Sequence, residues 1–197
     1  MLANLVIIIS GLGFLAVGYN FYTDQFSFFT SLGFLQIVLF YGLGTYLSND
    51  QKLSQTYSYF TFSALLVTTC LFGNYCGLKN WGDLAAILMP VLMVYLVADS
   101  FLSKTKFVGA GAVAQFAQPL VIALGLWSGL FRTTTHIATA FFFAEIAAFY
   151  LVATIIKKQI SNFYVSQVAI AITSWKLLQY ANLETSYFMI FYAIYGA

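Results

Sequence analysis

Seven long apolar runs, separated by short polar segments, restrict what this sequence can fold into. They cover residues 2–19, 26–47, 55–73, 83–101, 107–130, 134–156 and 162–181. Each run has about the 20 residues that an α-helix needs to cross the apolar layer of a bilayer. We therefore predict an all-α protein, a polytopic transmembrane helix bundle of about seven spans.

The low charge content excludes a soluble domain of this size. Charged residues make up 7% of the 197 residues, whereas soluble domains carry about 25%. So few charges cannot cover a folded chain in water, and the lipid bilayer is the expected surrounding. The basic residues lie in short separate loops, which excludes a nucleic-acid-binding patch.

The last apolar segment is shorter than a span. Residues 186–197 are twelve in number, and a helix of that length rises about 18 Å, too little to cross. Three interpretations stay open: a half-helix, an interfacial segment packed on the bundle, or the start of a further span. We treat residues 1–197 as a single transmembrane helical domain, which under the third interpretation is the membrane part of a longer chain.

Basic residues in the loops predict the orientation. With seven spans, five lysines fall on one side and two basic residues on the other: Lys52, Lys104, Lys106, Lys157 and Lys158 against Lys79 and Arg132. An excess of Lys and Arg marks the cytoplasmic side of a membrane protein. The N-terminus is therefore predicted to be cytoplasmic.

One carboxylate lies near the middle of an apolar run. Glu145 stands in the stretch FFFAEIAAFY, residues 141–150, about ten residues from either end of its run. That position is close to the bilayer centre, where a charge costs several kcal/mol. We therefore predict that Glu145 faces the bundle interior, where it binds a proton or cation or forms an ion pair.

Lys176 is the predicted ion-pair partner of Glu145. It lies about three quarters of the way along the run 162–181, on one helical stripe with Thr173, Gln179 and Tyr180. Its long side chain can cover much of the gap to Glu145. The alternative is that Lys176 extends to the outer interface while Glu145 is protonated or hydrogen-bonded to a helix backbone.

Two prolines and two glutamines form a second polar feature. Pro90 and Pro119 each remove a backbone hydrogen bond inside a run, and Gln115 and Gln118 come just before Pro119. Freed polar groups of this kind line the wet cavity of a transporter or channel, or they are satisfied by neighbouring helices around a kink. Both interpretations stay open.

Small residues predict that the fifth and sixth runs touch, because they let membrane helices approach closely. They recur at four-residue spacing: Ala110, Ala114, Gly125 and Gly129 in one run, and Ala140, Ala144 and Ala148 in the next.

Two further ionisable residues are candidates at the span ends. Asp99 lies near the cytoplasmic end of the run 83–101 and belongs either to an ion path or to an ordinary interfacial helix end. His136, the single histidine, begins the sixth run on the outer side. It is a candidate pH sensor, with an interfacial cap as the alternative.

Motifs of membrane enzymes are absent from the sequence. HExxH, GxSxG and Walker A do not occur, and one histidine excludes a multi-histidine metal site. We expect no metal and no cofactor, and the sequence does not favour an enzyme.

The pattern favours a transporter or channel for a small solute or ion, with Glu145 as an intramembrane proton, cation or ion-pair site. The alternative is a non-catalytic membrane-anchoring or scaffolding subunit of a larger assembly, which the short loops and the lack of a catalytic cluster favour. A homo-oligomer or a larger membrane complex is compatible with either.

Overall fold

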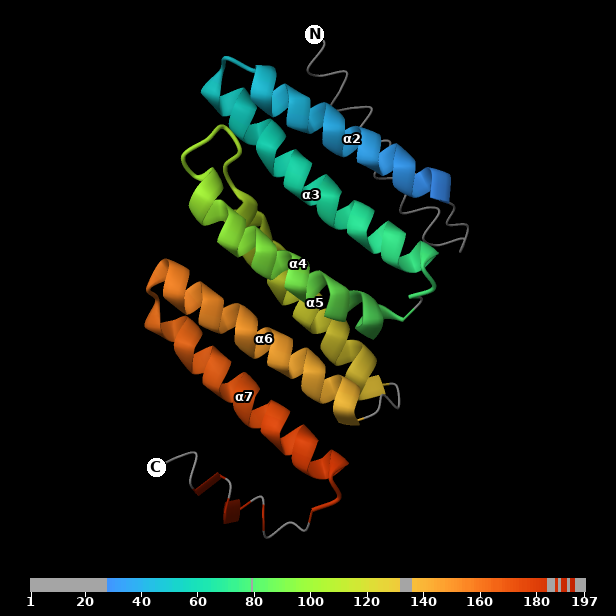
Figure 1. The fold of residues 1–197 in the computed structure, drawn as a ribbon, viewed down its shortest axis with the longest axis vertical. Helices are drawn as coiled ribbons and strands as arrows, with labels where there is room; N and C mark the ends of the chain where they lie inside the picture. Colours follow the sequence, from blue (N-terminus) through green and yellow to red (C-terminus); the bar gives the residue numbers. More distant parts are fainter. Residues whose placement is uncertain are drawn as a thin grey trace. The chain divides into compact units, whose positions relative to one another are not determined.

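The computed structural model describes residues 28–78, 80–131 and 136–183, together with 187, 189–190 and 192–193. These residues form long helices, and none of them lies in a strand. The helices are α2 (Phe28–Leu47), α3 (Gln51–Tyr75), α4 (Trp81–Leu102), α5 (Ala110–Phe131), α6 (His136–Lys157) and α7 (Ile160–Tyr180), as Figure 1 shows. The predicted all-α architecture is confirmed for the part of the chain that is described.

Polar residues set the limits of these helices. Asp50 caps the start of α3, where its side chain accepts a hydrogen bond of 2.9 Å from the backbone N–H of Lys52. Lys157 lies in the last turn of α6, where its charge stabilises the negative end of the helix dipole. Lys158 follows with a left-handed backbone, φ 53°. These short polar turns reverse the chain, so α2 with α3 and α6 with α7 form helical hairpins (Figure 1).

Four of the described helices are long and apolar enough to cross a membrane. The stretches are Thr30–Leu47, Trp81–Leu102, Ala110–Trp127 and His136–Lys157. Helices α3 and α7 have 25 and 21 residues, but their Ser, Thr, Gln and Lys side chains make them less apolar. The seven predicted spans are therefore more than these residues show, and the predicted run over residues 2–19 lies outside the described part.

The two prolines do not interrupt their helices. Both α4 and α5 continue through Pro90 and Pro119 respectively. Each proline lacks an N–H, so it leaves the carbonyl one turn earlier, of Ala86 and of Gln115, without its usual helical donor. The prolines thus release backbone acceptors without breaking the helix.

Contacts group the chain into two compact units, and the first contains α2, α3 and the segment Phe101–Val113. Tyr41 of α2 is fully buried, and its ring stacks on Phe60 of α3 with the centroids 5.1 Å apart. Nearer the turn, the Ser54 hydroxyl of α3 donates to the Thr45 carbonyl of α2 at 2.9 Å. An aromatic core and a buried polar bond therefore fix the α2–α3 hairpin.

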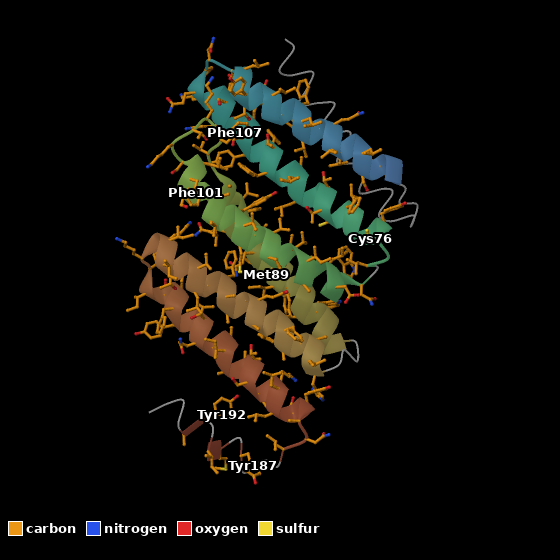
Figure 2. All side chains as sticks on the ribbon, in the orientation of Figure 1. Cys76, Met89, Phe101, Phe107, Tyr187 and Tyr192 are labelled. Carbon is orange, nitrogen blue, oxygen red and sulfur yellow. The ribbon has the colours of Figure 1, made fainter. Side chains whose placement is uncertain are left out.

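The second unit contains the segment Asn80–Ser100, which holds most of α4, together with α5 from Ala114 onward, α6 and α7. Met89, Leu92 and Leu96 share one face of α4 and are almost fully buried (Figure 2 labels Met89). Helix α6 packs along α7. Every site residue predicted from the sequence lies in this unit.

A short C-terminal segment contacts α7. Its described residues, 187, 189–190 and 192–193, are helical. The Tyr192 hydroxyl donates to the Ala171 carbonyl in α7 at 2.9 Å, and Figure 2 labels this tyrosine. This bond supports the interpretation of the segment as one that packs on the bundle.

Candidate functional site around Glu145

Glu145 lies deep within α6. It is nine residues after His136 and twelve residues before Lys157, which places it about 14 Å and about 18 Å from the helix ends. One turn away on its side of the helix are Phe142 and Phe149, which are buried, and Phe141, which is exposed. Glu145 therefore sits at the edge of the buried face of α6.

The Glu145 carboxyl group has an unsatisfied oxygen. The residue as a whole is half-buried, but its Oε2 atom is buried and has no hydrogen-bond partner among the described residues. A buried polar atom of this kind costs about 1–3 kcal/mol when no partner replaces water. Its charged form costs more than its neutral form, because a charge loses more solvation on burial. The site is therefore suited to binding a proton or a cation.

Helix α5 runs antiparallel to α6 beside this site. The Gln118 amide of α5 donates to the Tyr150 hydroxyl of α6. Further along, Gly125 of α5 lies so close to the Phe142 ring that an added Cβ would collide with it. The predicted contact between the fifth and sixth runs is thus confirmed.

These two contacts give the register of α5 on α6. Gln118 meets Tyr150, and Gly125 meets Phe142. The two contacts are therefore seven residues apart along α5 and eight residues apart, in the opposite direction, along α6. Glu145 therefore falls between the two contacts, at the level of Ile122 in α5. An inter-helix hydrogen bond lies to one side of the carboxylate and a close apolar contact lies to the other.

The two glutamines of α5 have different environments. Gln118 is 6% exposed and bonded to Tyr150, whereas Gln115 is exposed. Of the two glutamines, Gln118 is therefore the one whose side chain contributes to the α5–α6 contact. The sequence marked both glutamines as candidates, because it does not show which helix face meets a neighbour.

Lys176 does not pair with Glu145 in this structure. Its Nζ donates to Gln179 Oε1 of the same helix at 3.2 Å and lies 5.8 Å from the centroid of the Trp175 ring. Glu145 lies twelve residues before the end of α6, so the residue twelve positions after the start of α7 is level with it in the α6–α7 hairpin. Lys176 lies sixteen positions after the start of α7. The difference of four residues is about 6 Å. The ammonium turns along its own helix instead of bridging that distance.

The other predicted candidates lie at helix ends. Asp99 is half-buried in the last turn of α4, and His136 is the exposed first residue of α6. His136 is about 14 Å from Glu145 along the helix. Within the described part of the chain, no group of three or more His, Cys, Asp and Glu residues could hold a metal ion.

Tyr150 is a site residue that the sequence did not reveal. It ends the stretch FFFAEIAAFY and reads there as one more apolar aromatic. Its hydroxyl is the acceptor for buried Gln118, about one and a half turns from Glu145. A signal was present, since a tyrosine inside a span needs a partner for its hydroxyl. No protein-family model, curated protein or solved structure matches the chain.

Proposed function

We propose that this protein is a membrane transporter or channel in which Glu145 takes up and releases a proton or a small cation. The observation that carries the proposal is the buried, unpartnered Oε2 atom of Glu145 in the middle of α6, a helix long and apolar enough to cross a membrane. About seven spans and a cytoplasmic N-terminus, as the loop lysines predict, belong to this proposal.

The bare carboxylate of Glu145 and its protonated or cation-bound form differ in free energy at this depth. A bare carboxylate in the membrane interior is unfavourable by several kcal/mol, and an added proton or a bound cation removes most of that cost. Within the described part of the chain, Glu145 forms no ion pair, and the Lys176 ammonium is bonded to Gln179 instead. A permanent ion pair would have given the carboxylate a purely structural role. Without such a pair, a proton or cation can bind to the carboxylate and leave it.

The polar groups of α5 extend this site along the helix pair. The Gln118–Tyr150 bond lies on the side of Glu145 toward Lys157, which is the predicted cytoplasmic end. Pro119 leaves the Gln115 carbonyl one turn earlier without a helical donor. These groups offer acceptors and donors for water or an ion between Glu145 and that end.

Flux measurements in liposomes test the proposal. The protein is reconstituted with a trapped pH-sensitive dye, a potassium diffusion potential is imposed with valinomycin, and proton entry is recorded. Sodium and potassium fluxes are measured separately, with gradients of each ion and without valinomycin. We expect flux above that of empty liposomes for one of these ions, and a loss of at least about tenfold in Glu145→Gln.

The matched control is Asp83→Asn, which makes the same carboxyl-to-amide change at an exposed position in the first turn of α4. We expect its flux to equal that of the wild type. Wild-type flux in Glu145→Gln, or no flux of any of the three ions through the wild-type protein, would contradict the proposal.

A non-catalytic membrane-anchoring or scaffolding subunit is the second candidate. It is favoured by α7, which is less apolar than the four candidate spans yet exposes Phe163, Tyr164 and Trp175. A partner protein in the membrane would cover such aromatic side chains more favourably than water. This candidate predicts a stable protein without ion flux, and the liposome experiment therefore separates the two.

A further inference from the structure

Three lysines gather at one end of the first unit. Lys104 and Lys106 lie on the loop between α4 and α5, and Lys52 lies in the first turn of α3. Both α4, which ends at Leu102, and α5, which begins at Ala110, are candidate spans. The loop between them therefore lies at the depth of the lipid headgroups.

Hydrogen bonds fix this loop on the α2–α3 hairpin. Lys106 Nζ donates to the carbonyls of Tyr46 and Ser48, at 2.9 and 2.8 Å, where α2 ends. A cation at this end of a helix is favoured by the helix dipole. The Ser58 hydroxyl of α3 donates to the Val108 carbonyl at 2.8 Å. The loop that carries Lys104 and Lys106 is thus held against the end of α2 and the first turns of α3, the helix whose first turn carries Lys52.

Among the residues that the structure describes, no carboxylate neutralises the positive charge of this lysine cluster. All three lysines are exposed, and none of them forms an ion pair with another residue of the described ranges. Asp50, the acidic residue nearest Lys52 in sequence, uses its carboxylate to cap α3. Asp99, the acidic residue nearest Lys104 and Lys106 in sequence, is half-buried in the last turn of α4. Two of the three N–H groups of the Lys106 ammonium donate to the two carbonyls where α2 ends, and the third can donate to a ligand. The cluster therefore offers N–H donors and a net positive charge at headgroup depth.

Exposed apolar side chains adjoin the lysine cluster. Tyr46, Leu47 and Phe101 are 67%, 70% and 72% exposed. Figure 2 labels Phe101, in the last turn of α4, and Phe107, in the loop. Acyl chains can contact such residues while the headgroup phosphate meets the lysines. We propose that Lys52, Lys104 and Lys106 form a binding site for the headgroup of an anionic phospholipid.

Native mass spectrometry of the detergent-purified protein tests this site. The protein is titrated with phosphatidylglycerol and, separately, with zwitterionic phosphatidylcholine. We expect a phosphatidylglycerol adduct of higher affinity. Each lysine near a phosphate contributes about fivefold in affinity, so Lys52→Gln with Lys104→Gln should weaken phosphatidylglycerol binding about 25-fold. Lys106 is left unchanged because it also holds the loop.

Lys157→Gln with Lys158→Gln is the matched control, since it removes the same charge at the α6–α7 turn. We expect its affinity for phosphatidylglycerol to stay within about twofold of the wild type. Equal weakening in both double variants, or equal affinity for the two lipids, would overturn the proposal. Thermal unfolding verifies that each variant is folded. If the test variant fails to fold, the single substitutions decide, each being expected to weaken binding about fivefold.

Discussion

Replacing Glu145 by leucine should stabilise the protein, and under the proposed function it should also abolish ion flux. The Oε2 atom is buried without a hydrogen-bond partner, and such an atom costs about 1–3 kcal/mol. Because the residue as a whole is half-buried, we expect the lower part of that range, about 1–2 kcal/mol in the free energy of unfolding. Leucine removes the unsatisfied atom and keeps apolar contact with the phenylalanines on its side of α6.

Thermal unfolding in detergent measures this effect. A gain of about 1–2 kcal/mol corresponds to a rise of about 2–8 °C in Tm for a chain of this size. Asp83→Leu is the control, because Asp83 is an exposed acid on α4, and its unfolding free energy should change by less than about 0.5 kcal/mol. A lower Tm in Glu145→Leu would refute the reasoning, since it would mean that the carboxylate has a stabilising partner.

Three further substitutions test contacts within one unit or the other, and thermal unfolding measures the effect of each. Gly125→Ala should destabilise by about 1–3 kcal/mol, because the added methyl group meets the Phe142 ring. Tyr150→Phe should cost about 1–2 kcal/mol, because it leaves the buried Gln118 amide without its acceptor. Lys106→Met should cost about 1 kcal/mol, a low value because this ammonium and its two carbonyl partners are exposed to solvent.

Each of these substitutions has a control. Gly33→Ala in α2 adds a methyl group that meets no described residue within 4 Å, and it should be neutral or stabilising. Gln118→Met should restore stability to Tyr150→Phe, because neither polar partner then remains. Lys104→Met, measured in zwitterionic detergent, should leave Tm unchanged. Equal effects in a variant and its control would show that the contact contributes nothing specific.

The helices themselves were largely predictable. The predicted run 134–156 corresponds to α6 (His136–Lys157), and the run 83–101 corresponds to α4 (Trp81–Leu102). Helix α3 (Gln51–Tyr75) begins before the predicted run because Asp50 caps it, and that cap brings polar residues into its first turn. Helix formation depends on nearby residues and on apolar content, both of which can be read directly.

The described residues show fewer candidate spans than the seven predicted, for a related reason. The runs over 55–73 and 162–181 were read as spans by their length, but α3 and α7 carry more hydroxyl and amide side chains than the other helices. Several of these hydroxyls bond to their own helix, as Thr68 does to the Ala64 carbonyl at 2.8 Å. Such bonds satisfy the hydroxyl groups within the helix, but the polar side chains still lower its apolar content, and length alone does not report this.

The sequence by itself determined the class of the protein, the places where helices form, and the presence of a carboxylate deep in one of them. Tertiary structure decided which polar groups meet. Gln118 bonds to Tyr150 across 32 positions and Lys106 to Tyr46 across 60, while Lys176 stays on its own helix with Gln179. The physical reason is that a local pattern fixes a helix and its faces, whereas register and rotation between helices depend on packing contacts between residues far apart in the chain.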